Sequence, residues 1–367
     1  MTNKKSKKRI GILTGGGDCP GLNAVIRGVA KACMGQHGFE VIGIIDGFEG
    51  LIRKKTIALT WQHVSGILTL GGTILGTSNR ANPFKWAESQ NKDGVTFSDV
   101  SDQVVDYVEE LGLDALVCIG GDGTMAIAHK LSLKGIGVVG VPKTIDNDIC
   151  GTDITFGFDS AVATATEALD KIHTTAMSHH RVMVVELMGR YAGWLTLHAG
   201  IAGGGDVILI PEIPYRLEAV CRIVRERSKR GRRFSIVVVS EGAKPEGGDV
   251  IVKRVVKDST DPVRLGGIGH RVADDIEQKT GLASRVTVLG HLQRGGTPTA
   301  FDRVLATRYG VKAAELCAKG THGVMVALKG REIDSVPLKD IGGKMRLVEP
   351  DHPLIQVARH VGTCIGA

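Results

Sequence analysis

Short aliphatic runs recur along the chain, and most are followed by glycine and then by a longer amphipathic stretch. Within these runs the apolar residues are consecutive rather than alternating, which is typical of parallel strands covered on both faces. The strands predicted on this basis are Arg9–Thr14, Val41–Ile45, Asp114–Ile119, Ile136–Val141, Arg181–Leu187, Val207–Ile210, Ser235–Val239 and Val286–Leu289.

Apolar residues at helical spacing predict helices between these strands. The predicted helices cover Leu22–Met34, the segment from GGDGT through Leu131, Asp159–Met177 and Leu217–Arg227. The strand–glycine–helix unit recurs in both halves of the chain. We therefore predict an α/β fold: two similar three-layer α/β/α domains with mainly parallel sheets and the active site in the cleft between them.

A chain of 367 residues is long enough for two domains. The first is predicted to take residues 1–158 and about 293–343, and the second about 159–292 and 344–367. The segment Gly242–Gly267 interrupts the pattern, because it is rich in Gly, Asp, Lys and Pro, and it is predicted to be an exposed loop or hairpin insertion.

Composition narrows the classes of partner. Glycine supplies 50 residues and aromatics only 4%, which suits aliphatic strands joined by tight turns and argues against a base-stacking nucleic-acid binder. A net charge of +7 favours anionic partners such as phosphorylated metabolites. The seven cysteines are scattered without a CxxC pair, which indicates reduced cytoplasmic thiols, and neither a signal peptide nor a membrane span is predicted.

Two glycine-rich motifs follow predicted strands, where ligands bind in open parallel sheets. In TGGGDCPG (14–21), glycines let the backbone approach a phosphate at the start of the next helix, although a plain tight turn explains the motif equally well. In GGDGT (120–124), Asp122 is either a carboxylate placed to hold Mg²⁺ against phosphate oxygens or a helix N-cap.

The motif PKTIDND (142–148) follows another buried strand. Asp146 and Asp148 lie two residues apart, so in extended backbone their carboxylates would point the same way. Two carboxylates at one site indicate divided roles, one as a base and one orienting or binding metal, whereas solvated turn acids are the structural alternative.

Cationic residues form a fourth group. Arg285, His291 and Arg294 lie in SRVTVLGHLQRGG, Arg181 begins another predicted strand, and Arg190 follows that strand. Guanidinium groups match phosphate oxygens, so a phosphate pocket is favoured, although His291 taken alone would be structural. A phosphate cradle, a metal carboxylate, a base and an anion pocket together make up what phosphoryl transfer requires.

These ordered motifs resemble the phosphofructokinase family from Ile10 to about Gly330. The resemblance is carried by GILTGGGDCPGLNAVIRG (11–28), GGTILGTSNR (71–80), GGDGT, PKTIDND, RVMVVELMGRYAGWLTL (181–197) and RVTVLGHLQRGG (285–296). It implies a glycolytic kinase that phosphorylates fructose 6-phosphate at its 1-hydroxyl with ATP and Mg²⁺. It also implies that the first domain binds the donor and the second the sugar phosphate.

The resemblance implies catalytic roles for four residues. Asp146 would take the proton from the sugar hydroxyl, Thr144 would hold the transferring phosphoryl group, and Asp148 would support magnesium and Asp146. Arg190 would stabilise charge on the moving phosphoryl group. Asp122 would coordinate Mg²⁺, and the other residues implied on the donor side are Gly17, Arg80, Gly123, Thr124 and Lys143.

On the acceptor side, the resemblance implies that Met188 and Gly189 touch the sugar and that Glu241 binds its hydroxyls. The residues implied for the 6-phosphate are Arg181, Arg285, His291 and Arg294. In this family, two of the arginines (here Arg181 and Arg285) come from a neighbouring subunit. A homo-oligomer is therefore implied, with a tetramer favoured and a dimer possible.

The phosphoryl donor is less firmly indicated. Gly123 resembles ATP users, whereas pyrophosphate users carry Asp at that position, and Lys143 resembles the pyrophosphate users. ATP is favoured, with pyrophosphate as the alternative. The rival hypotheses are an NAD or lipid kinase, which shares GGDGT alone, a non-catalytic sugar-phosphate sensor, and nucleic-acid binding. The presence of Asp122, Asp146 and Arg190 argues against a decayed sensor.

Overall fold

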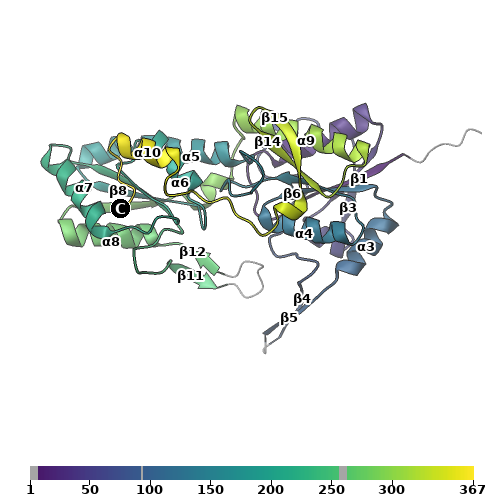
Figure 1. Cartoon of the computed structure of the whole chain (residues 1–367), viewed down its shortest axis with the longest axis horizontal. Coiled ribbons are helices and arrows are strands. Elements are labelled where there is room, and N and C mark those ends of the chain that lie inside the picture. The colour runs from purple at the N-terminus through teal and green to yellow at the C-terminus, as the bar shows by residue number, and fades with distance from the viewer. Residues whose placement is uncertain (1–6, 92–93, 256–262) are drawn as a thin grey trace, which may run out of the picture.

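A computed structural model describes residues 7–91, 94–255 and 263–367. Two larger β-sheets form the centres of the two halves seen in Figure 1. The first sheet has seven strands in the order β15-β14-β7-β6-β1-β2-β3, with antiparallel strands only at its edges. Its strands are β1 (Arg9–Thr14), β2 (Glu40–Ile44), β3 (Thr56–Leu59), β6 (Ala115–Gly120), β7 (Val138–Pro142), β14 (Val324–Lys329) and β15 (Glu332–Pro337).

The second sheet has four strands in the order β13-β8-β10-β9, and all of its pairings are parallel. Its strands are β8 (Val182–Leu187), β9 (Val207–Leu209), β10 (Ser235–Ser240) and β13 (Ser284–Val288). Two short antiparallel pairs lie outside both sheets, β4 (Trp86–Asn91) with β5 (Gly94–Ser98), and β11 (Val252–Val255) with β12 (Val263–Leu265).

Helices cover both faces of the seven-stranded sheet. Along β6, Val117 and Ile119 belong to the core shared with α1 (Leu22–Lys31) and α9 (Ala300–Lys319). Leu116 and Cys118 belong to the opposite core, built with α3 (Ser101–Glu110) and α4 (Asp122–Leu133). Every β6 side chain is thus buried, which explains why the strand reads as an uninterrupted apolar run.

The four-stranded sheet is a second three-layer unit. Val237 and Val239 of β10 pack with α7 (Leu217–Lys229) and α8 (Ile268–Thr280). Ile236 and Val238 pack with α5 (Phe158–His179) and α6 (Trp194–Ala202). The remaining described helical segments are α2 (Phe48–Ile52), α10 (Pro353–His360), the π-helix η1 (Ala32–Gln36) and the 3₁₀ turns η2 (Ile67–Thr69), η3 (Gly290–Arg294) and η4 (Leu338–Asp340).

The predicted α/β fold with mainly parallel sheets is confirmed. Each predicted strand is present, with ends that differ by no more than two residues. The edge strands β3 and β15 escaped prediction because they are half-exposed and lack a continuous apolar run. The inner strand β14 was missed as well, although its run is apolar and mostly buried. The helix predicted to reach Met34 ends as α1 at Lys31 and continues as the π-helix η1.

The insertion predicted at Gly242–Gly267 contains the β11–β12 hairpin; residues 256–262 of the prediction lie outside the described residues. The strands of the seven-stranded sheet come from residues 9–142 and 324–337, and those of the four-stranded sheet from 182–288. The domain bounds given above stay a prediction. None of the described helices combines the length and apolar character needed to cross a membrane.

Helices α1 and α9 cross at two glycines. A Cβ on Gly310 would lie 2.7 Å from the Val25 carbonyl oxygen and 2.9 Å from the Val29 nitrogen. A Cβ on Gly28 would lie 3.0 Å from the Thr307 carbonyl oxygen. Both positions are helical, so the absence of a side chain here serves the close approach of two backbones.

We expect Gly310→Ala to lower the free energy of unfolding by about 1–3 kcal/mol, measured by urea denaturation, because the added methyl overpacks a backbone contact. This loss opposes the gain of about 1 kcal/mol that alanine brings to a helix interior. The matched control is Gly123→Ala in α4, where a Cβ meets no atom within 4 Å. A stabilised Gly310→Ala protein would contradict the close contact.

A buried carboxylate joins the starts of α5 and α9. Asp302 is fully buried, and its Oδ2 accepts from the Ser160 amide at 2.8 Å and from the Ser160 hydroxyl at 2.6 Å. The Thr299 amide donates to the Ser160 hydroxyl in turn. Burial raises the pKa of Asp302 to about 6, although the hydrogen bonds from Ser160 act to lower the pKa.

Because the pKa of Asp302 is higher folded than unfolded, the folded protein holds more protons between about pH 4 and 6, and this group's contribution to stability falls as the pH rises through that window. Asp302→Asn removes the titration while keeping an oxygen for Ser160. We expect the unfolding free energy of the variant, relative to wild type, to rise by about 1–3 kcal/mol from pH 4 to 7. The exposed Asp102→Asn serves as control, and a flat difference for Asp302→Asn would contradict the expectation.

Candidate active site

Two adjoining cavities lie where loops leave the carboxyl ends of the strands. The smaller has a volume of about 290 Å³ and the larger about 820 Å³. Gly17, Asn79, Asp148 and Arg294 line both cavities, so these residues mark the junction. Pockets of this size and position are typical of small-molecule sites in α/β proteins.

The smaller cavity is bounded by glycine-rich loops and the start of a helix. After β1, the Gly15 amide donates to the Ile119 carbonyl and the Gly16 amide to that of Ser78, which joins the loop to β6 and to GTSNR. Gly16 has a φ of 78°, a left-handed conformation that glycine adopts without strain. Asp122, Gly123 and Thr124 open α4 and line the same space. Free amides at a helix start favour an anion.

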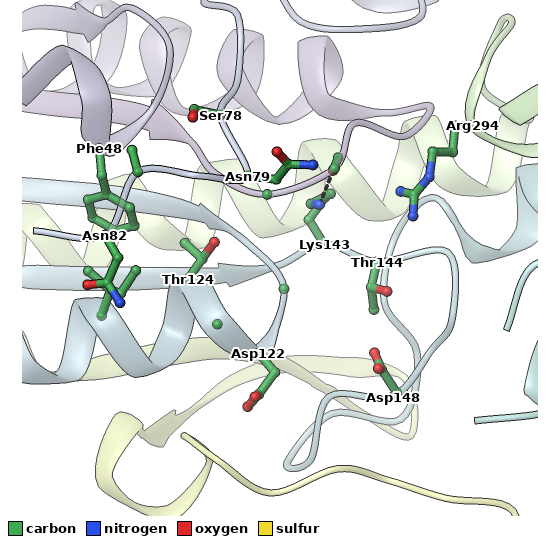
Figure 2. A pocket seen from close by; sticks show the side chains of 16 residues that line it. Phe48, Ser78, Asn79, Asn82, Asp122, Thr124, Lys143, Thr144, Asp148 and Arg294 are labelled. Atoms are coloured by element: carbon green, nitrogen blue, oxygen red, sulfur yellow. Dashed lines mark hydrogen bonds between the residues drawn. The ribbon is translucent and has the colours of Figure 1, made fainter. Parts of the chain in front are cut away.

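Figure 2 shows how the side chains are distributed along this cavity. Thr144, Asp148 and Arg294 lie at one end, and Phe48 and Asn82 lie at the other. Lys143 lies between them and donates a hydrogen bond from Nζ to the Gly17 carbonyl. Lys143 is only 4% exposed, and burial lowers its pKa. The cavity thus runs from a charged end to a wall of apolar and amide groups.

Asp122 and Asp148 bring carboxylates to the charged end. Asp122 Oδ1 accepts from the Gly343 amide at 3.1 Å, and burial raises its pKa. Burial and the adjacent Asp146 raise the pKa of Asp148 to about 7, although a hydrogen bond from Thr144 acts to lower the pKa. Two half-buried acids beside a phosphate-sized space are the oxygen ligands that Mg²⁺ prefers when it also binds substrate phosphates.

Asp146 lies on the side of the larger cavity. Its amide donates to Thr144 Oγ1 at 3.1 Å, while its side-chain Oδ1 is buried without a hydrogen-bond partner among the described residues. Burial raises its pKa, Glu241 adds to this effect, and Arg294 and Lys143 oppose it. A carboxylate oxygen left unpartnered in such a place is available to accept a proton from a ligand.

The prediction that the backbone is extended between Asp146 and Asp148 was wrong. Asn147 between them has a φ of 52°, so the backbone is left-handed rather than extended. Asn147 Oδ1 accepts from the Thr155 amide at 3.0 Å, which stabilises the turn. Both acids nevertheless line the larger cavity.

The larger cavity collects residues from three strands of the second sheet. Met188 and Arg190 follow β8, Glu241 follows β10, and His291 lies in η3 after β13. Burial, with Glu186 nearby, raises the pKa of Glu241. Arg190 Nη1 donates to the Val263 carbonyl at 3.0 Å, and its guanidinium lies 4.7 Å from the centre of the Tyr191 ring.

Most of the predicted site residues therefore lie around the two joined cavities. Gly189 and Arg80 do not line them but flank residues that do; Gly189 has a φ of 131°, and the Arg80 amide donates to Ser78 Oγ. Arg181 directly precedes β8, and Arg285 is the second residue of β13. Both are at the amino ends of their strands, the edge opposite the cavities.

Several residues that line the cavities were missed by the sequence reasoning. Asn79 sits inside GTSNR and Tyr191 directly follows MGR, so both could have been found from their motif neighbours. Phe48 and Ile127 carry no such signal, because an apolar residue beside a site reads like any core residue. Lys253 and Arg254 come from the insertion, which had been given no role.

The phosphofructokinase family model matches residues 9–317. An ATP-dependent 6-phosphofructokinase 2 of Clostridium perfringens is 50% identical, with 97% of each chain covered. A pyrophosphate–fructose 6-phosphate 1-phosphotransferase of Amycolatopsis methanolica is also 50% identical, with 94% of this chain and 97% of that protein covered.

Among solved structures, phosphofructokinase of Pichia pastoris in the T-state is 34% identical with a TM-score of 0.79; the match covers 92% of this chain and 35% of that longer one. Family model, sequence relatives and fold agree over nearly the whole length. The chain belongs to the phosphofructokinase family.

Proposed function

We propose that this chain is an ATP-dependent 6-phosphofructokinase, which transfers the γ-phosphoryl group of ATP to the 1-hydroxyl of fructose 6-phosphate. The observation that carries the proposal is the pair of joined cavities, with Asp146 on the larger one and phosphate-binding loops on the smaller. Relatives about 50% identical over nearly the full chain bear the name of this activity.

The acceptor sugar occupies the larger cavity, with its 1-hydroxyl at Asp146. The unpartnered Oδ1 accepts the hydroxyl proton as the sugar oxygen attacks the γ-phosphorus, and the bond from that phosphorus to the bridging oxygen breaks so that ADP leaves. Thr144 holds the transferring group, and Arg190 offsets the charge that develops on it. Met188 and Gly189 contact the sugar, and Glu241 binds its hydroxyls.

The donor occupies the smaller cavity, with its phosphates against Gly17, Gly123 and Thr124 and close to Lys143 and Arg80. Asp122 would hold Mg²⁺, with support from Asp148; the ion would neutralise charge on the donor phosphates. Within the described ranges, no group of three or more His, Cys, Asp or Glu could enclose a metal.

The residues that line the far end of the smaller cavity favour ATP over pyrophosphate as the donor. Beyond the phosphate loops, the lining continues to Phe48, Ala81, Asn82 and Ile127. A nucleoside fills such an apolar and amide-bearing wall, whereas pyrophosphate would leave it empty. The Amycolatopsis relative, equally similar and named for pyrophosphate, keeps that donor as the second candidate.

His291 and Arg294 bind the 6-phosphate. Arg181 and Arg285 act in trans in a homo-oligomer, for which a tetramer is favoured, because within one chain they belong to the opposite edge of the sheet.

Residues 1–158 and about 293–343 form the donor domain, and about 159–292 and 344–367 form the sugar-phosphate domain. The enzyme is cytoplasmic.

We expect Asp146→Asn to lower kcat by roughly 10²–10⁴-fold, because the base is lost while the shape of the side chain is kept. Fructose 6-phosphate binding, measured by calorimetry, should persist. Turnover is measured with ATP and, in parallel, with pyrophosphate. Near-normal turnover of the variant would remove Asp146 as the base.

We expect Gly123→Asp to lower kcat/KM for ATP by roughly 100-fold, because a second carboxylate repels the nucleotide phosphates. The position tolerates a side chain, since a Cβ there meets no atom within 4 Å, so folding should be unaffected. Gly123→Asn, of the same size but neutral, separates crowding from charge. An Asp variant with wild-type kcat/KM for ATP would count against this placement of the donor.

A further inference from the structure

The larger cavity is lined in part by the β11–β12 hairpin. Lys253 and Arg254 of β11, and Val263 and Leu265 of β12, belong to its wall. In Figure 1 the hairpin extends from beneath the four-stranded sheet toward the half of the molecule that carries β4 and β5. The insertion therefore contributes two cationic side chains to the acceptor cavity, and the proposed function gives them no role.

An irregularity in the hairpin explains how two consecutive residues reach one cavity. On a regular strand, neighbours point to opposite faces. Here the pairing shifts after Val252, which pairs with Leu265, to Arg254, which pairs with Arg264. Such a bulge at Lys253 re-aims side chains, a use found next to binding sites. Lys253 and Arg254 both line the cavity as a result.

Hydrogen bonds fix the chain just before and just after the hairpin, at residues 244–246 and 267–269. On the entry side, the Tyr215 amide donates to the Lys244 carbonyl, and the Glu246 amide donates back to the Tyr215 carbonyl. On the exit side, the buried Glu186 accepts from the Gly267 amide at 3.2 Å and the Gly269 amide at 2.8 Å.

Arg190 adds a link from the site itself through its bond to the Val263 carbonyl. The hairpin that carries Lys253 and Arg254 is thus hydrogen-bonded to Arg190, which follows β8, and the chain that leaves it is hydrogen-bonded to β8 at the start of α8.

The position of these cations points to the anionic end of the acceptor. Arg294 lines both cavities, whereas Lys253 and Arg254 line only the larger one, so they border the acceptor and not the donor cavity. A sugar with its 1-hydroxyl at Asp146 directs its 6-phosphate away from the donor as well. A dianionic phosphate attracts ammonium and guanidinium groups strongly.

We propose that Lys253 and Arg254 bind the 6-phosphate of the acceptor and make the enzyme select a phosphorylated sugar over the free sugar. This inference rests on the proposed function, because it requires the acceptor to occupy the larger cavity. The two residues act in cis, from the same chain that supplies Asp146. They are specificity-determining residues, so they act mainly on KM and not on kcat.

The test uses Lys253→Met, Arg254→Met and the double variant, which keep much of each apolar stem and remove the charge. With saturating ATP, we expect the double variant to raise KM for fructose 6-phosphate by roughly 10–100-fold, the range for lost charge-assisted hydrogen bonds. The kcat value should stay within about 3-fold, and KM for ATP should not change. The preference for fructose 6-phosphate over D-fructose, as a ratio of kcat/KM, should fall by the same factor as KM rises.

The matched control is Lys329→Met, a lysine on the β14–β15 hairpin outside both cavities, and thermal unfolding checks the fold of every variant. An unchanged KM in the double variant would overturn the inference. A fall in kcat at constant KM would overturn it too, because the hairpin would then act by orienting Arg190.

Calorimetric titration with fructose 6-phosphate in the absence of ATP separates this inference from the proposed function. Equal affinity of the wild type and the double variant would overturn the hairpin inference whatever the turnover. Wild-type protein that binds the sugar phosphate but does not phosphorylate it would overturn the proposed reaction, and weaker binding by the double variant would still support the hairpin inference. Wild-type protein that binds no fructose 6-phosphate would overturn both.

Discussion

The burial of like charges at the junction of two cavities is the constraint on which the site depends. Asp146 and Asp148 are withdrawn from water two residues apart, and burial raises the pKa of both. A buried carboxylate is costly unless opposite charges or hydrogen bonds compensate it. Lys143 and Arg294 supply that compensation for Asp146, and hydrogen bonds supply it for Asp148. Lys143 is itself buried and hydrogen-bonded to the glycine-rich loop after β1. The acids, the lysine and the loop therefore form one electrostatic unit.

The fold makes this unit possible because its core is continuous. One apolar cluster includes Ile12 and Val141 of the seven-stranded sheet, Leu197 of α6 and Ile208 of the four-stranded sheet. Loops that leave both sheets are consequently held by packed elements. The close crossing of α1 and α9 and the buried Asp302 network act in the same way on the elements around the loop that carries Arg294. A rigid scaffold with polar loops at its strand ends is a general solution for positioning reactive groups.

The cations named for the site divide into groups by their location. Arg294 lies at the junction, His291 and the hairpin residues Lys253 and Arg254 lie on the acceptor side, and Arg181 and Arg285 lie at the opposite edge of the sheet. In the proposed function, His291, Arg294 and the hairpin cations attract the acceptor's 6-phosphate, whereas Arg190 offsets charge on the moving phosphoryl group. The insertion Gly242–Gly267, predicted as an exposed loop or hairpin, thus forms part of the wall of the larger cavity.

The sequence by itself determined the fold class, the inner strands apart from β14, and the motifs at their carboxyl ends, because apolar runs buried on both faces and glycine-rich loops are local signals. Asp122, Asp146 and Arg294 could be named from such signals, whereas Lys143 was named only through the family resemblance. Only the tertiary structure brought Phe48, Ile127 and Lys253 to the cavities, since apolar and lysine side chains look the same in a core or on a surface as in a site. It also decided that Asn147 turns the backbone between the two acids and that a bulge aims Lys253 and Arg254 inward. These outcomes depend on tertiary contacts that no local pattern encodes, such as that of Asn147 with Thr155 across a loop and that of Arg190 with the distant Val263.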